Sequence, residues 1–209
     1  MQSLNYKNFI TGLLLSILCA LILFILSYSY GKNQFFLLLN TDLGTVADNF
    51  FNFFSYLGDG LLWIPLVVYF VYKEGKRMLP LLISSFALTT AFTQACKYLI
   101  VPDELRPTAA ITNEFIHTVN GVTVHATASF PSGHTATAFV FYLIFCLVFE
   151  NKLWLVAGLF YALIVGYSRI YLAQHFPFDV AAGIVVAIVS VIFSLLIQNR
   201  FSKRKSNNL

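Results

Sequence analysis

The sequence predicts an all-α membrane protein, a single domain covering residues 1–209 and built from six transmembrane helices. Its composition is 58% hydrophobic and 11% charged, with a mean hydropathy of +0.77, whereas soluble domains carry about 25% charged residues. The apolar residues also gather into runs whose lengths approach the roughly 17–25 residues that a transmembrane helix needs. This chain therefore lacks the polar surface of a soluble protein.

Six apolar runs follow one another along the chain, and each is predicted to be a transmembrane helix. They cover residues 9–30, 54–72, 78–99, 133–149, 153–171 and 178–198. The first run is longer than the core of a signal peptide and no A-x-A site follows it, which favours a retained helix. The second run has a short uninterrupted part, so it needs the preceding aromatic stretch NFFNFFSY, which is typical of a membrane-interface belt.

The basic residues predict the orientation of these helices. Alternating spans place nine of the thirteen Lys and Arg residues on one side of the membrane. These nine are Lys7, Lys73, Lys76, Arg77, Lys152, Arg200, Lys203, Arg204 and Lys205. The positive-inside rule then predicts that both termini are cytoplasmic. We interpret the net charge of +4 as an orientation signal rather than as a nucleic-acid surface. Small size and the absence of a targeting signal favour a bacterial inner membrane.

Charged and polar residues gather at the outer ends of the last four predicted helices. They are Lys97, Arg106, Ser132, Gly133, His134, Arg169, His175 and Asp179. Because successive helices alternate in direction, all of these ends reach the same membrane face. Three cations at one point repel one another unless an anion with several oxygens lies between them, and Arg and Lys together suit a phosphoryl group. The N-termini of two helices would add backbone N–H donors.

The two histidines suit different roles in phosphoryl transfer. Asp179 lies four residues after His175, close enough to fix the tautomer of the ring, so that the other ring nitrogen can attack phosphorus. His134 would protonate the leaving oxygen. A structural interpretation is open for each residue alone, since a single Arg at the end of a span is usually an anchor and Ser132 could simply cap a helix. To explain the whole set without a shared function, a structural role would have to hold independently at every one of these positions.

The same residues resemble the three-part signature of the type 2 phosphatidic acid phosphatase (PAP2) superfamily, K-x6-RP, PSGH and SR-x5-H-x3-D. Residues 131–134 read PSGH, and Ser168 to Asp179 match the third part without a gap. The first part departs from the pattern, because eight residues (YLIVPDEL) separate Lys97 from Arg106. The signature region covers about residues 85–183, and the six-helix layout extends the resemblance to nearly the whole chain.

The resemblance implies a helical bundle and a metal-independent lipid phosphatase that forms a phosphohistidine. It implies that His175 is the nucleophile and His134 the general acid, and that phosphate is bound by the cations with help from the Ser and Gly of PSGH. The expected partners are the bilayer and a lipid phosphate. The candidate substrates are isoprenyl diphosphates such as undecaprenyl diphosphate, phosphatidylglycerol phosphate, phosphatidate and lipid A phosphates. Vanadium-dependent haloperoxidases share the pocket, but they are soluble.

Two other functions are compatible with parts of the pattern. A phosphotransferase would use the same residues with an acceptor other than water. A transporter or lipid-binding protein would show polar residues at mid-span and an internal repeat, whereas here the polar residues crowd one end. No metal or cofactor is predicted, because His117 and His125 in the 100–132 loop match no common ligand spacing. That loop and residues 31–53 are expected to shape the headgroup site. No feature indicates an oligomeric state.

Overall fold

The computed structural model describes residues 4–206, and it describes the side chains of residues 4–202. All regular structure in this range is helical. Nine α-helices are described: α1 (Tyr6–Tyr30), α2 (Lys32–Leu39), α3 (Thr45–Tyr56), α4 (Trp63–Glu74), α5 (Leu79–Ala95), α6 (Pro107–Ala110), α7 (Gly133–Val148), α8 (Leu153–Tyr171) and α9 (Pro177–Ser206). Short turns η1 (Gly60–Leu62), η2 (Gly75–Met78) and η3 (Cys96–Ile100) connect some of them. The prediction of orientation includes three basic residues whose side chains lie outside the described ones, Lys203, Arg204 and Lys205.

Four helical stretches of the described chain are long and apolar enough to cross a membrane. They are Tyr6–Tyr30, Gly60–Ile100, Leu153–Tyr171 and Pro177–Ser202. α7 is apolar but has 16 residues, and the stretch Gly60–Ile100 contains both α4 and α5, separated by η2. The all-helical membrane class is therefore confirmed, while the number of crossings remains a prediction.

The predicted helix over residues 54–72 is interrupted. α3 ends at Tyr56, and α4 begins at Trp63 after the turn η1. The sequence LGDG causes the break, because the side chain of Asp59 accepts a hydrogen bond from the Leu61 N–H at 2.8 Å and thereby starts a new helical turn. Asp and Asn commonly begin helices in this way. The aromatic stretch consequently belongs to a separate helix, α3.

α7 lies at the centre of the bundle. Its sequence, GHTATAFVFYLIFCLV, is apolar around its whole circumference, which is typical of a buried helix. Every residue from Thr135 to Leu143 is buried. α8 and α9 pack extensively against α7, and α1, α5 and the aromatic side chains of α4 also contact it. The N-terminal end of α7 is thereby held at a fixed place among the ends of its neighbours.

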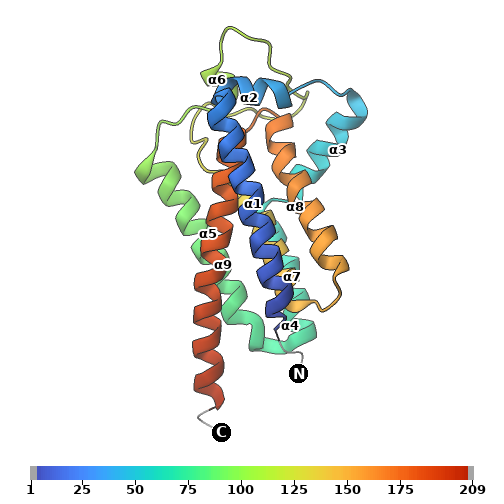
Figure 1. Cartoon of the computed structure of the whole chain (residues 1–209), viewed down its shortest axis with the longest axis vertical. Coiled ribbons are helices and arrows are strands. Elements are labelled where there is room, and N and C mark those ends of the chain that lie inside the picture. Colours follow the sequence, from blue (N-terminus) through green and yellow to red (C-terminus); the bar gives the residue numbers. More distant parts are fainter. Residues whose placement is uncertain (1–3, 207–209) are drawn as a thin grey trace.

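The chain ends and the short connections define two ends of the bundle (Figure 1). The beginning of α1, the α4–α5 connection, the α7–α8 connection and the end of α9 lie at one end. The helices α2 and α6 and the α8–α9 connection lie at the other. The C-terminal ends of α5 and α8 therefore meet the N-terminal ends of α7 and α9, as the alternation of apolar runs predicts.

α5 and α9 face each other with small polar side chains at mid-span. Ser85 and Thr89 of α5 and Ser190 and Ser194 of α9 are all buried, and these two helices are in extensive contact. Small hydroxyl residues let membrane helices approach closely. At the end away from α2, Gln198 accepts a hydrogen bond from the Leu81 N–H at 3.1 Å. Polar residues are thus not confined to one end of the described bundle.

Asn40, which follows α2, joins three segments at the other end of the bundle. Its amide nitrogen donates to the carbonyl oxygens of His117, Ile170 and Tyr171 at 3.2, 3.1 and 2.9 Å. Its amide oxygen accepts from the His117 N–H at 2.8 Å. Asn40 is buried, so these bonds fix the 100–132 loop and α2 against the last turn of α8, next to Arg169.

Gly183 of α9 is needed for a close approach to α7, and its replacement is our first prediction. A Cβ at this position would lie 2.6 Å from the Ser132 carbonyl oxygen and 3.1 Å from the Cβ of Thr135. Because α9 would have to shift, we expect Gly183→Ala to lower the free energy of unfolding by about 1–3 kcal/mol and to reduce catalytic activity. Thermal unfolding in detergent measures the first effect. Gly60→Ala is the control, since no atom lies within 4 Å of that Cβ position, and equal melting temperatures would contradict the prediction.

Candidate active site

A cavity of about 420 Å³ lies where these helix ends meet. Six of the eight residues predicted for the site line it, namely Lys97, Arg106, Gly133, His134, Arg169 and His175. The other two, Ser132 and Asp179, are fully buried beside the lining residues. The folded chain therefore brings the whole predicted set together, although the set comes from four separate parts of the sequence.

Backbone carbonyl groups of the 100–132 loop and the α8–α9 connection hold two of the cations. Nη1 of Arg106 donates to the carbonyl oxygen and to Oε1 of Gln174, both at 3.0 Å, and Nε donates to the Thr127 carbonyl oxygen at 3.0 Å. Nζ of Lys97 donates to the Ala128 carbonyl oxygen at 2.5 Å. Lys97 lies at the cavity although eight residues, rather than six, separate it from Arg106. The π-helical turn η3 and the bend after it accommodate the two additional residues.

Arg169 comes from the last turn of α8 and is buried. Its Nη1 donates a hydrogen bond to Oγ of Ser55, which belongs to α3. Its Nε has no hydrogen-bond partner among the described residues. Buried donors are usually satisfied, so this N–H is suited to receive an oxygen of an anionic ligand in the cavity.

His175 and Asp179 face each other across the α8–α9 connection. Nδ1 of His175 lies 3.6 Å from Oδ2 of Asp179, and the same oxygen accepts hydrogen bonds from Oγ of Ser129 at 2.5 Å and from the Phe176 N–H at 3.0 Å. These donors orient the carboxylate toward Nδ1. Burial lowers the pKa of His175 well below its ordinary value, and the charges of Arg106, Arg169 and Lys97 act in the same direction. The imidazole is therefore neutral, as a nucleophile requires.

The PSGH turn caps α7. Oγ of Ser132 accepts hydrogen bonds from the Thr135 N–H at 3.4 Å and from Oγ1 of Thr135 at 2.8 Å. The Ser132 N–H donates to the carbonyl oxygen of Asp179 at 3.0 Å, which ties the beginning of α7 to the beginning of α9. Gly133 and His134 are the residues of this turn that line the cavity, and Ser132 lies behind them. Their position at a helix N-terminus favours an anion, and a direct contact of Ser132 with phosphate stays a prediction.

The family model of the PAP2 superfamily matches residues 79–203. The chain belongs to the PAP2 superfamily. This confirms the resemblance inferred from the signature, and the chain is a phosphatase of the PAP2 type.

Two known proteins are similar to the chain in sequence. An undecaprenyl-diphosphatase from Sulfolobus acidocaldarius is 25% identical over 151 residues, which cover 72% of this chain and 70% of that protein. A protein from Bacillus licheniformis named bacitracin transport permease protein BcrC is 34% identical over 137 residues, 63% of this chain and 62% of that protein.

Two solved structures resemble the PAP2 fold of this chain. The crystal structure of Aquifex aeolicus LpxE has a TM-score of 0.65 and 31% identity, covering 77% of this chain and 92% of that one. A PAP2 type phosphatidylglycerolphosphate phosphatase from Bacillus subtilis has a TM-score of 0.58 and 20% identity, covering 94% of this chain and 96% of that one. This second likeness supports the fold alone.

Several residues of this PAP2 site were not predicted from the sequence. Ser129 and Gln174 lie between the matched letters of the signature, where only their polar character could have indicated a role. Ser55 and Asp59 line the cavity but come from the α3–η1 segment, which precedes the residues that the family model matches. His125 also lines the cavity, as expected for the 100–132 loop.

His117 does not reach this cavity. Its Nε2 lies 3.0 Å from Oδ1 of Asp48 and its Nδ1 lies 4.0 Å from Oδ1 of Asp42. The ring also packs against Tyr171, with ring centroids 4.9 Å apart. These carboxylates come from the 31–53 segment, so His117 attaches the 100–132 loop to that segment.

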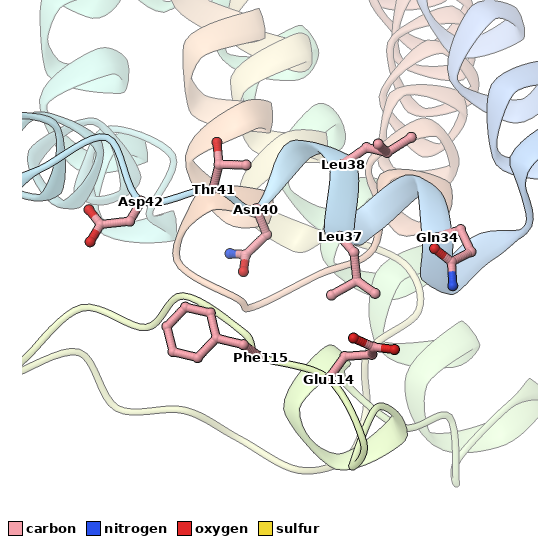
Figure 2. Close-up of a pocket in the computed structure, with 8 residues that line it drawn as sticks. All are labelled: Gln34, Leu37, Leu38, Asn40, Thr41, Asp42, Glu114 and Phe115. Atoms are coloured by element: carbon pink, nitrogen blue, oxygen red, sulfur yellow. The ribbon is translucent and has the colours of Figure 1, made fainter.

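A second cavity of about 470 Å³ lies between α2 and the 100–132 loop (Figure 2). Glu114 and Phe115 form one side of it, and α2 with the residues that follow it forms the other. Its charged lining groups are the carboxylates of Asp42 and Glu114, and its eight lining residues include no Lys, Arg or His. A phosphate would be repelled there, so the first cavity is the candidate active site.

Proposed function

We propose that this PAP2 phosphatase hydrolyses an isoprenyl diphosphate, such as undecaprenyl diphosphate, through a phosphohistidine intermediate. One observation carries the proposal: three cations line a single cavity together with His134 and His175, and His175 faces a buried carboxylate. The choice of substrate rests on the Sulfolobus relative, whose name is undecaprenyl-diphosphatase. The proposal that the substrate is a lipid rests on the apolar helices, because the cavity lies at one end of their bundle.

In the first step, Nε2 of His175 attacks the terminal phosphorus. Nδ1 of the ring faces Asp179 at 3.6 Å, which favours the tautomer with a proton on Nδ1 and a lone pair on Nε2. The bond between phosphorus and the bridging oxygen breaks, and His134 gives its proton to the leaving lipid phosphate. Lys97, Arg106 and Arg169 stabilise the charge that develops on the equatorial oxygens, which is usually the largest contribution to catalysis.

In the second step, a water molecule attacks the phosphohistidine. His134, now neutral, accepts a proton from this water, which is the reverse of its first role. The bond between phosphorus and Nε2 breaks, inorganic phosphate leaves, and both histidines return to their initial states. Asp179 holds the His175 ring in the same orientation through both steps.

We also propose that the chain crosses the membrane six times, through α1, α4, α5, α7, α8 and α9. Both termini then lie in the cytoplasm and the cavity opens on the outer face of a bacterial inner membrane. The basic connections support this orientation, because they lie at the end of the bundle opposite α2 (Figure 1). A lipid could then enter sideways, with its tail in the bilayer and its phosphates among the cations.

Phosphate release by the purified protein in detergent with EDTA tests the function. The substrates are farnesyl and undecaprenyl diphosphate, phosphatidylglycerol phosphate, phosphatidate and lipid A. We expect the highest kcat/KM for an isoprenyl diphosphate and no loss of activity with EDTA. A preference for another lipid would overturn the substrate class alone. Release that requires an added acceptor alcohol would instead identify a phosphotransferase, and no release by folded protein would leave the binding alternative.

A further inference from the structure

The α3–η1 turn, residues 55–59 at the end of α3 and before η1, forms one wall of the candidate active site. Ser55, Tyr56 and Asp59 line the cavity, yet all of them precede residue 79, where the match to the PAP2 family model begins. The signature therefore does not include this wall.

Contacts on two neighbouring helices hold the turn firmly in place. Ser55 accepts a hydrogen bond from Nη1 of Arg169, and the Leu57 carbonyl oxygen accepts one from the Tyr161 hydroxyl at 2.5 Å. A Cβ at Gly58 would lie 2.6 Å from Cγ1 of Val165 and 3.0 Å from the carbonyl oxygen of His134. The absence of a side chain at Gly58 thus lets the turn lie directly against the first turn of α7.

Asp59 presents one carboxylate oxygen to the general acid proposed above. Its Oδ1 accepts the hydrogen bond from the Leu61 N–H at 2.8 Å that begins η1. Its Oδ2 lies 4.0 Å from Nε2 of His134. This separation exceeds a direct hydrogen bond, but catalytic hydrogen bonds often tighten when substrate binds, and one water molecule can bridge such a distance.

The charges around His134 explain why a carboxylate is useful there. Lys97 from η3, Arg106 from the following loop and Arg169 from α8 share its cavity. These cations are needed to bind phosphate, but they disfavour a proton on the neighbouring imidazole. Asp59 offers the opposite charge to the same ring, within the distance at which a carboxylate favours the protonated form.

We propose that Asp59 is a positioning residue for His134: it orients the ring and stabilises the positive charge that the ring carries when it gives its proton to the leaving oxygen. This inference rests on the proposed function. The site would then contain two pairs of histidine and carboxylate. Asp179 orients His175 as nucleophile, and Asp59 supports His134 as acid.

Asp59 could act by supporting the general acid or by binding substrate, and these two roles differ in how the rate depends on the leaving group. A general acid matters greatly when an alkoxide leaves, as from dodecyl phosphate, and little when p-nitrophenolate leaves. Asp59→Asn removes the charge and keeps an oxygen that can begin η1, since Asn is as good a cap as Asp. We expect this variant to lower kcat/KM for dodecyl phosphate by about 10–100-fold and kcat/KM for p-nitrophenyl phosphate by less than about threefold. The ratio kcat/KM reports the step in which the leaving group departs, and general acid catalysis contributes roughly 10²–10⁴-fold to such a step. Asp59→Glu is expected to restore part of the loss.

Leu61→Ala is the matched control, because Leu61 lies in the same turn with a side chain that is 73% exposed, and we expect it to leave both rates unchanged. Equal losses for both substrates in Asp59→Asn would overturn the proposal and assign Asp59 to substrate binding or folding. A wild type inactive on all lipid phosphates would overturn the proposed function itself.

Discussion

Replacement of His175 by alanine is expected to lower kcat by about 10⁴-fold or more, as the loss of a catalytic nucleophile does in other enzymes. The residue is buried at the end of the cavity, with Nδ1 facing Asp179. Since burial and three nearby cations keep its pKa well below the ordinary value, the neutral ring can attack phosphorus without first losing a proton. Alanine leaves no nucleophile, while the cations that bind phosphate remain.

The decisive measurements are initial rates with the preferred lipid phosphate and trapping of a labelled phosphoenzyme. Trapping requires an alkaline quench, because phosphohistidine is labile in acid. His125→Ala is a useful comparison, since this histidine lines the same cavity but has no carboxylate assigned to it, and a far smaller loss is expected. If His175→Ala retained turnover within tenfold of the wild type, the nucleophile would have to be another residue.

Replacement of Arg169 by lysine is expected to lower kcat/KM by about 10²–10³-fold, the usual cost of losing one donor to the charge of the transition state. Lysine keeps the positive charge but loses the planar fork of donors. In this structure Nη1 of Arg169 is already bonded to Ser55, while Nε is buried without a partner among the described residues. A single ammonium group cannot make the Ser55 bond and also place a second donor at the phosphate.

Steady-state kinetics on folded protein measure this loss, and the melting temperature shows whether the variant is intact. Arg200→Lys is the control, because Arg200 lies near the C-terminal end of α9, away from the cavity. The kinetics of this variant should match those of the wild type. Inhibition by orthovanadate, which resembles the transition state of phosphoryl transfer, should weaken in parallel with kcat/KM. Unchanged kcat/KM in Arg169→Lys would show that charge alone suffices at this position.

The helical class and most of the site could be predicted from local features of the sequence. The apolar runs mark the helices, and their alternation carries the ends of α5, α7, α8 and α9 to one end of the bundle. PSGH stands at the beginning of α7, where a helix N-terminus suits an anion. Asp179 comes four positions after His175, a spacing that brings their side chains together in a turn entering a helix. Each of these inferences depends on neighbours in the sequence or on the direction of a helix.

The predicted helix over residues 54–72 shows where local reasoning ends. Its hydropathy suggests one span, but the cap that Asp59 forms on Leu61 separates α3 from α4. Hydropathy averages over a window and does not register a single side chain that ends or starts a helix. This break also directs the α3–η1 turn into the cavity.

By itself, the sequence determined that the protein is helical, suited to a membrane, and equipped with a phosphate-binding signature at one end of its helices. Only the tertiary structure decided that Lys97 still lines the cavity at its longer spacing, that Ser55 holds Arg169, and that Asp59 faces His134. Ser55 and Arg169 lie 114 residues apart. Such contacts depend on how whole helices pack against one another, and no periodicity or motif in one segment records where a distant segment will lie.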